Sequence, residues 1–217
     1  MLDGPRLPPA AGGKPDSLAV FLHGYGADGN DLIEIGRVWS SVLPHTEFVA
    51  PHAPQAMSGS PMGRQWFPLT LADPTEYWHG VTAAQPELDA FLDAELARSG
   101  FGDDRLALIG FSQGTMMALH AGPRRQSAPA AIVGFSGLLA GPEHLGGTKA
   151  RPPVLLLHGD RDDLIPDIAC EMAARALGAA GFLVEWHISQ GLGHGIDQAG
   201  LHCGVTFLAR ALAAKAA

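Results

Sequence analysis

One short stretch of the sequence places a serine in a setting that favours nucleophilic chemistry. Gly110-Phe111-Ser112-Gln113-Gly114 fits the pattern G-x-S-x-G, in which two glycines flank a serine on a tight turn between a strand and a helix. The glycines have no side chains, so the serine hydroxyl is left exposed. The segments on either side of the serine have the pattern that this turn requires, because Leu106–Phe111 predicts a strand and Gln113–Ala121 predicts a helix. We therefore predict that Ser112 is a nucleophile that attacks an acyl carbonyl.

A serine hydroxyl needs a base to take its proton, and histidine commonly has this role. Six histidines follow Ser112 in the sequence: His120, His144, His158, His187, His194 and His202. In the order that accompanies G-x-S-x-G, an acid comes next and the histidine last. This order disfavours His158, whereas His187 lies in a predicted strand and His202 in an amphipathic helix. His194 lies in a glycine-rich loop between the last predicted strand and helix, and we predict that it is the base.

The acid that orients this histidine should follow the strand predicted at Val154–His158. Three carboxylates, Asp160, Asp162 and Asp163, qualify by position. The structural alternative, that such aspartates only cap the next helix, applies to Asp163 and Asp167. Position alone leaves the choice among the three candidates open.

An acyl-enzyme mechanism also needs backbone donors for the negative oxygen of its tetrahedral intermediate. One donor is expected from the N–H of Gln113, directly after the nucleophile. The other is expected from the glycine-containing loop Leu22–Gly29, which follows an early strand. His23 in this loop resembles a ligand or a base, but it precedes Ser112 and ends a strand. We interpret it as a residue that positions the loop.

Charge and cysteine content exclude several other classes of protein. The 217 residues carry a formal net charge of −8 at pH 7, and Arg124-Arg125 is the nearest approach to a basic stripe, so we expect no nucleic-acid partner. Cys170 and Cys203 form no C-x-x-C pair, so we expect neither a metal site nor a disulfide. The sequence shows no signal-peptide run and no apolar run of membrane-spanning length. We therefore expect a cytoplasmic protein without an integral membrane span.

The segments that position these residues alternate between strand and helix. Six short apolar runs predict strands buried on both faces, as in a parallel sheet: Ser17–His23, Glu47–Ala50, Leu106–Phe111, Ala131–Phe135, Val154–His158 and Phe182–Ile188. Five segments have helical periodicity: Asp31–Val42, Thr82–Arg98, Gln113–Ala121, Ile168–Ala180 and Ala199–Ala214. This alternation predicts a mostly parallel central sheet with helices on both faces. We expect a loose N-terminal segment, residues 1–16, and a single domain, residues 17–217.

One connection is longer than the others. Pro51–Gly80 is rich in proline and carries four aromatic side chains, which are Trp66, Phe67, Tyr77 and Trp78. A long loop of this kind in a compact domain usually has a function. We interpret it as a wall of a substrate pocket, with a purely structural loop as the alternative.

Taken together, these motifs resemble the phospholipase/carboxylesterase family of α/β-hydrolases, which includes acyl-protein thioesterases. The matching stretches are Leu22–Gly26, Ala50–Pro54, Gly110–Gly114, Phe135–Gly137, His158–Pro166 and Gly193-His194. They occur in the family's order and extend from about Leu18 to Leu208. The resemblance implies an α/β-hydrolase fold with no cap domain, and the short connection between Ala131–Phe135 and Val154–His158 agrees with this.

The resemblance also implies roles for individual residues. The acid of the family's H-G-x-x-D motif falls on Asp162, and its backbone oxyanion donors fall on Tyr25 and Gln113. The family usually has leucine where this chain has Tyr25, which implies a narrower or more polar pocket. The acyl-pocket stretch of the family falls on Trp66 and Phe67, and we expect Leu138 to belong to the same pocket.

The activity that the resemblance implies is hydrolysis of short- to medium-chain acyl esters, with thioesters or lysophospholipids as alternatives. No metal or organic cofactor is expected, and a homodimer is compatible with the family. A peptidase or amide hydrolase on the same fold is the nearest alternative. A non-catalytic binding protein that kept the fold is a more distant one.

Overall fold

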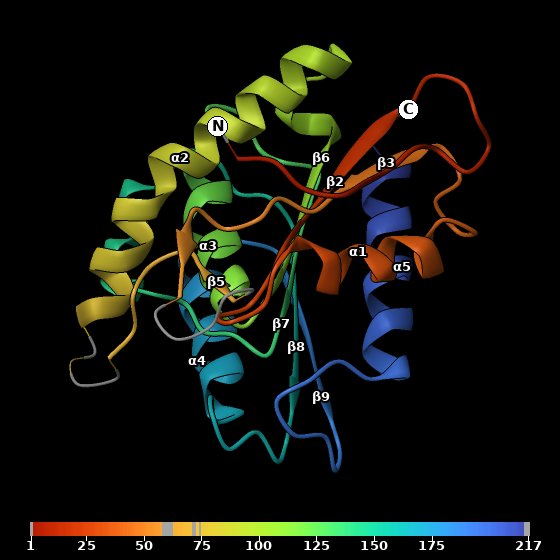
Figure 1. Ribbon diagram of the computed structural model, residues 1–217. Helices are drawn as coiled ribbons and strands as arrows, with labels where there is room; N and C mark the ends of the chain where they lie inside the picture. Colours follow the sequence, from red (N-terminus) through yellow and green to blue (C-terminus); the bar gives the residue numbers. More distant parts are fainter. Residues whose placement is uncertain (1, 58–62, 71–72, 74, 215–217) are drawn as a thin grey trace.

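The computed structural model describes residues 2–57, 63–70, 73 and 75–214 (Figure 1). Its centre is a seven-stranded sheet with the order β1-β3-β2-β6-β7-β8-β9. The strands are β1 (Arg6–Leu7), β2 (Ser17–Leu22), β3 (Thr46–Val49), β6 (Leu106–Phe111), β7 (Ala131–Phe135), β8 (Val154–Gly159) and β9 (Val184–Ser189). The α-helices are α1 (Gly29–Trp39), α2 (Thr75–Ser99), α3 (Gln113–Ala121), α4 (Ile168–Ala179) and α5 (Gln198–Ala213).

Helices cover both faces of the sheet, which confirms the predicted layers. Helices α2, α3 and α4 lie on one face, and α1 and α5 lie on the other (Figure 1). Alternate side chains of β2 serve the two faces: Leu18, Val20 and Leu22 join one hydrophobic cluster. Ala19 and Phe21 join the cluster on the opposite face. Because both faces are buried, the strand appears in the sequence as a continuous apolar run.

The parallel strands bring the residues with predicted chemistry to one edge of the sheet. β2, β3, β6, β7, β8 and β9 run parallel to one another, so their carboxyl ends lie at the same edge. Ser112 directly follows β6, Asp162 lies in the loop after β8, and His194 lies in the loop after β9. The topology therefore brings together three segments that are far apart in the sequence. Ligand sites of open α/β sheets commonly lie at this edge, outside the carboxyl ends of the strands.

Part of the predicted long loop forms regular structure. Helix α2 begins at Thr75 rather than at the predicted Thr82, because Tyr77 and Trp78 in its first turns pack against the core. Earlier in the same connection, β4 (Gln55–Ala56) and β5 (Arg64–Gln65) pair as a short antiparallel hairpin. Residues 58–62, 71–72 and 74 of this connection lie outside the described residues.

The N-terminal segment, expected to be loose, is instead joined to the sheet. β1 pairs antiparallel with β3, and the Ala50 N–H donates to the Pro5 carbonyl at 3.0 Å. The Arg6 guanidinium donates to Glu47 at 2.8 Å and to Glu95 at 2.5 Å, and Arg98 contacts the same two carboxylates. Because both glutamates are buried, the segment supplies the charge that they need.

Replacing Arg6 with methionine tests this role. The Arg6→Met variant leaves Glu47 and Glu95 buried with Arg98 as their remaining partner, so we expect the free energy of unfolding at pH 7 to fall by about 3 kcal/mol. Burial alone would raise the pKa of Glu95, but hydrogen bonds from Arg6 and Arg98 outweigh it and hold that pKa below its ordinary value. A lowered carboxyl pKa stabilises the fold above the unfolded-state pKa, and this contribution is lost as the pH falls. The difference between variant and wild type should therefore shrink towards pH 3.

Urea denaturation across this pH range measures the effect. Arg37→Met is the matched control, because Arg37 and Glu34 form an exposed ion pair on α1. Exposed pairs of this kind contribute about 1 kcal/mol at most. Equal losses of stability in the two variants would contradict a structural role for Arg6.

Candidate active site

The backbone at Ser112 adopts a strained turn of the kind that G-x-S-x-G requires. Ser112 has φ 54° and ψ −116°, and it is one of two non-glycine residues with positive φ among those described. The flanking glycines are required for steric reasons. A Cβ atom on Gly114 would lie 1.8 Å from the Leu22 carbonyl oxygen, and one on Gly110 would lie 2.4 Å from the Gly114 backbone. The turn therefore holds Ser112 between β6 and the first turn of α3.

Of the three candidate acids, Asp162 is the one that contacts the predicted base. Its Oδ2 atom lies 2.7 Å from Nδ1 of His194, and its Oδ1 atom accepts hydrogen bonds from the Leu164 and Ile165 amides at 2.9 Å. Burial alone would raise the pKa of the Asp162 carboxyl, but hydrogen bonds from Ile165, His194 and Leu164 outweigh it and lower that pKa. Asp162 is therefore an ionised acceptor that selects the Nδ1–H tautomer of His194.

The loop that carries His194 is held on several sides. Asp160, another candidate acid, accepts a hydrogen bond from the Gly191 amide at 2.6 Å and so fixes the start of the loop. The Ser136 hydroxyl donates to the Gly195 carbonyl at 3.0 Å and fixes its end. The His194 ring lies against Phe111, the residue before Ser112, with 5.0 Å between the ring centroids. These contacts bring the predicted base to the nucleophile's turn.

The supporting roles of two buried residues, His158 and Ser136, were not predicted from the sequence. His158 lies at the end of β8, with Nε2 at 3.2 Å from Asp162 Oδ2 and at 2.8 Å from the Ile165 carbonyl. Ser136 is the second non-glycine residue with positive φ, at 46°. Both occur in stretches that resemble the family's motifs, which is the signal that could have found them. His158 positions the acid's loop, and Ser136 positions the base's loop.

The loop after β2 lies directly beside the nucleophile. A Cβ atom on Gly24 would lie 3.3 Å from Cβ of Ser112. His23 is buried, and its ring nitrogens contact the Gly24 carbonyl at 2.8 Å and the Ala53 amide at 2.9 Å. Burial lowers the pKa of His23, so the ring is neutral and accepts from Ala53 through Nε2. His23 thus positions this loop, in agreement with the interpretation made from its place in the sequence.

Trp66 and Phe67 support the turn instead of offering ring surface to a ligand. Each is 1% exposed, and neither lines the cavity at the start of α2 that is described next. The Gln113 side chain accepts from the Trp66 amide at 2.9 Å and donates to the Phe67 carbonyl at 2.8 Å, while Trp66 Nε1 donates to the His23 carbonyl at 2.9 Å. These bonds draw the chain inward, so the expectation that both rings line the pocket is corrected.

A cavity at the start of α2 is lined by other aromatic residues. A cavity of about 540 Å³ lies between the start of α2 and the segment 138–144, and Tyr77, Trp78, Leu138 and Leu139 are among its lining residues. Gly137, the residue before Leu138, lies close to the nucleophile, because a Cβ atom on it would lie 2.9 Å from the Ser112 carbonyl oxygen. Leu138 therefore lines this cavity together with Tyr77 and Trp78 of α2, and its place in the substrate pocket stays a prediction.

Comparison with known proteins identifies the family. The sequence model described as Phospholipase/Carboxylesterase matches residues 10–212. The chain belongs to the phospholipase/carboxylesterase family. Esterase YpfH of Escherichia coli (strain K12) is 32% identical over 186 residues, which are 85% of this chain and 78% of that protein. Acyl-protein thioesterase 1 of Schizosaccharomyces pombe is 30% identical over 170 residues, which are 74% of this chain and 75% of that protein.

Solved structures agree with this assignment. The crystal structure of esterase PE8 is 46% identical, has a TM-score of 0.93, and is matched over 96% of this chain and 98% of that chain. The Bacillus cereus carboxylesterase is 18% identical with a TM-score of 0.78, matched over 97% of this chain and 95% of that chain, and it supports the fold alone. This member of the phospholipase/carboxylesterase family is therefore an enzyme, a hydrolase with the esterase or thioesterase activity of its family.

The described residues form neither a metal site nor a membrane span. No group of three His, Cys, Asp or Glu side chains there could hold a metal ion. No helix in the same part of the chain is long and apolar enough to cross a membrane.

The support that Gln113 gives to the turn can be tested by substitution. Gln113→Met keeps the backbone N–H but removes the partners of the Trp66 amide and the Phe67 carbonyl. Because two buried polar groups lose their hydrogen bonds, we expect the free energy of unfolding to fall by about 3 kcal/mol, measured by urea denaturation. Gln65→Met, which removes an exposed bond to Gln55, is the control, with an expected change below about 0.5 kcal/mol. An unchanged stability in Gln113→Met would show that the side chain is not a support.

Proposed function

We propose that this family member hydrolyses carboxylic esters with short- to medium-chain acyl groups, using Ser112, His194 and Asp162 as a catalytic triad. The observation that carries this proposal is the 2.7 Å contact between His194 Nδ1 and the buried Asp162 carboxylate. A triad needs its base held in one tautomer by an ionised acid, and this contact meets that requirement. The strained turn that presents Ser112 supports the same assignment.

The proposed reaction has two acyl transfers. Ser112 Oγ attacks the ester carbonyl carbon while His194 Nε2 takes the hydroxyl proton. The tetrahedral intermediate collapses to an acyl-Ser112, and His194 gives that proton to the departing alkoxide, which leaves as an alcohol. A water molecule, deprotonated by His194, then attacks the acyl carbonyl carbon. The bond to Ser112 Oγ breaks, His194 returns the proton to that oxygen, and the carboxylic acid is released. Asp162 stabilises the histidine cation in both halves and does not itself gain a proton.

The negative oxygen of each intermediate is assigned to backbone donors. We place it against the N–H groups of Tyr25 and Gln113, one on the loop after β2 and one at the start of α3. The short approach between Gly24 and Ser112 supports this placement, because it brings the two loops together at the nucleophile. Fixed donors of this kind stabilise the transition state strongly, since they need no reorganisation during the reaction.

The substrate class follows from the cavity beside the turn. Its apolar lining at Leu138, Leu139 and Trp78 suits an acyl chain, and Leu138 directly follows Gly137, which lies close to Ser112. Thioesters and lysophospholipids contain the same acyl group and are alternative substrates. The names of the two similar curated proteins, an esterase and an acyl-protein thioesterase, favour an ester or a thioester over an amide.

The triad is tested with p-nitrophenyl esters from acetate to laurate. Ser112→Ala should lower kcat by about six orders of magnitude. Asp162→Asn should lower kcat about 10⁴-fold, because it favours the wrong histidine tautomer. Asp163→Asn is the matched control, an exposed carboxylate in the same loop, and should retain wild-type kcat. Labelling of Ser112 by a fluorophosphonate distinguishes an active site from an inert binding protein. Folded wild-type enzyme that neither turns over an ester nor reacts with this reagent would refute the proposal.

If the cavity lined by Leu138 and Trp78 holds the acyl chain, the rate should depend on chain length. Each methylene that the cavity buries should raise kcat/KM about fourfold, which corresponds to about 0.8 kcal/mol of transition-state binding free energy. Leu138→Trp places a larger side chain in the lining of the cavity, so we expect kcat/KM for the octanoate ester to fall about tenfold relative to the acetate ester. Val38→Trp, on the exposed face of α1, is the control and should leave that ratio unchanged. A ratio that Leu138→Trp does not change would place the acyl chain elsewhere.

A further inference from the structure

His158 is a buried histidine at the end of an apolar strand. Side chains of β8 alternate between the two faces of the sheet, and Val154 and Leu156 join the hydrophobic cluster that includes residues of α3 and α4. His158 follows on the same face, because side chains two residues apart lie on one side of a strand. Its exposed fraction is 2%. Burying an imidazole among apolar side chains is costly unless its nitrogens have partners, so the contacts of this ring indicate its role.

The Nε2 atom of His158 meets two acceptors at once. It lies 2.8 Å from the Ile165 carbonyl oxygen and 3.2 Å from Oδ2 of Asp162. A carbonyl oxygen and an ionised carboxylate only accept hydrogen bonds, so Nε2 must carry the hydrogen. His158 therefore has the Nε2–H tautomer, the opposite of the Nδ1–H tautomer that Asp162 selects in His194. A single N–H is shared between the backbone of the loop and the acid.

These contacts hold the Asp162 carboxylate at both of its oxygens. Oδ1 accepts from the Leu164 and Ile165 amides at 2.9 Å. Oδ2 faces two rings, with His194 Nδ1 at 2.7 Å and His158 Nε2 at 3.2 Å. Ile165 contacts Oδ1 through its amide and His158 through its carbonyl, which closes a ring of contacts around the acid. The amides fix Oδ1, and His158 restrains Oδ2, the atom that binds the base.

We propose that His158 is a positioning residue for ester hydrolysis, which holds Asp162 Oδ2 in one place while His194 transfers protons. This inference rests on the triad of the proposed function. In that mechanism His194 Nε2 exchanges a proton with Ser112 Oγ, with the leaving oxygen and with water, which occupy different positions. The ring must adjust to each of them while Nδ1 stays bound to the acid. An Oδ2 atom held from a second side is a fixed pivot for these adjustments, so His158 acts on the reaction through Asp162.

Within the described residues, Asp162 is the one carboxylate at ion-pair distance from the His158 ring. The Cys170 thiol of α4 borders the same narrow internal space. Burial, with Asp167 and Glu171 nearby, raises the pKa of this thiol to about 12, so it is neutral. A side chain needed only to fill this space would be served best by an apolar group. The surroundings of the ring therefore favour donation to the acid over packing as the reason for a histidine.

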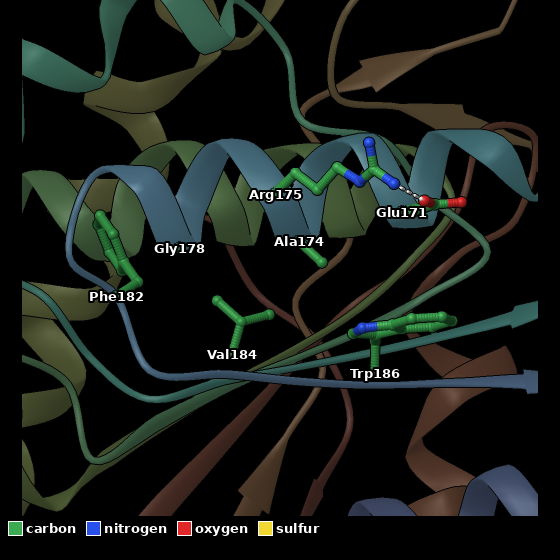
Figure 2. Close-up of a pocket in the computed structure, with 7 residues that line it drawn as sticks. All are labelled: Glu171, Ala174, Arg175, Gly178, Phe182, Val184 and Trp186. Carbon is green, nitrogen blue, oxygen red and sulfur yellow. Dashed lines mark hydrogen bonds and ion pairs between the residues drawn. The ribbon is translucent and has the colours of Figure 1, made fainter.

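The first experiment measures hydrolysis of p-nitrophenyl esters by variants at this position. His158→Leu keeps an apolar side chain in the core but cannot donate, so kcat should fall about 30-fold at unchanged KM, in the range that loss of an outer partner costs at metal-bound histidines. His158→Gln can place an amide N–H near the position of Nε2 and should recover kcat to within about threefold of the wild type. Cys170→Ala, beside the same internal space, and Arg175→Met, on the exposed face of α4 (Figure 2), are the controls and should retain wild-type kcat.

A double-variant cycle shows whether the effect passes through the acid. Asp162→Asn alone should lower kcat about 10⁴-fold. Because His158 acts through this carboxylate, adding His158→Leu to Asp162→Asn should lower kcat no further, whereas independent effects would multiply to about 3 × 10⁵-fold. Multiplied effects in the double variant, or a kcat within about threefold of the wild type in His158→Leu alone, would overturn the proposal.

A measurement on the wild type does not depend on the folding of any variant. Nitrogen-15 NMR of the histidine rings should show a proton on Nε2 of His158 at pH 7, and a ring without a proton there excludes the proposed contact. Wild-type enzyme that neither hydrolyses an ester nor reacts with a fluorophosphonate refutes the triad itself. An active wild type whose kcat does not respond to His158→Leu refutes the role of His158 alone.

Discussion

The contact between the first turn of α3 and the carboxyl end of β2 is the constraint on which the active site depends. A side chain at Gly114 would meet the Leu22 carbonyl oxygen at 1.8 Å, so the helix can approach the strand this closely only with glycine there. That approach forces Ser112 into its positive φ, which costs about 1–3 kcal/mol. Hydrogen bonds offset this cost, among them the bond from the Ser112 amide to the Phe135 carbonyl at 2.9 Å and the two that the buried Gln113 amide forms. The same packing places the loop after β2 beside the serine, so nucleophile and backbone donors are positioned by one contact.

A buried carboxylate imposes the second constraint. Asp162 is withdrawn from water, and a charged group in that position is tolerated only when hydrogen bonds replace the lost solvation. Two backbone amides from its own loop and the His194 ring supply those bonds. His158 adds a ring nitrogen at 3.2 Å. The loop after β8 is therefore shaped around this charge, and the orientation of His194 follows from that shape.

The parts of this structure that depend on local pattern could be predicted from the sequence. Continuous apolar runs gave the parallel strands, and the glycines around Ser112 gave the turn, because both patterns arise from neighbouring residues. The choice of Asp162 over Asp160 and Asp163 came only from the resemblance to a family, since all three follow the same strand. Long-range contacts were missed: residues 1–16 looked loose because the partners of Arg6 lie 41 and 89 residues away. Trp66 looked like a pocket wall because nothing local shows that Gln113 and His23 draw it inward.

The strand that leads to the predicted base is the least buried of the parallel strands. Strands in the middle of the sheet fix their ends by packing on two faces and two edges, whereas β9 lies at an edge and has Glu185 and Trp186 exposed. Packing alone therefore cannot define where His194 lies. The position comes instead from polar contacts with neighbouring loops, through Asp160, Asp162 and Ser136.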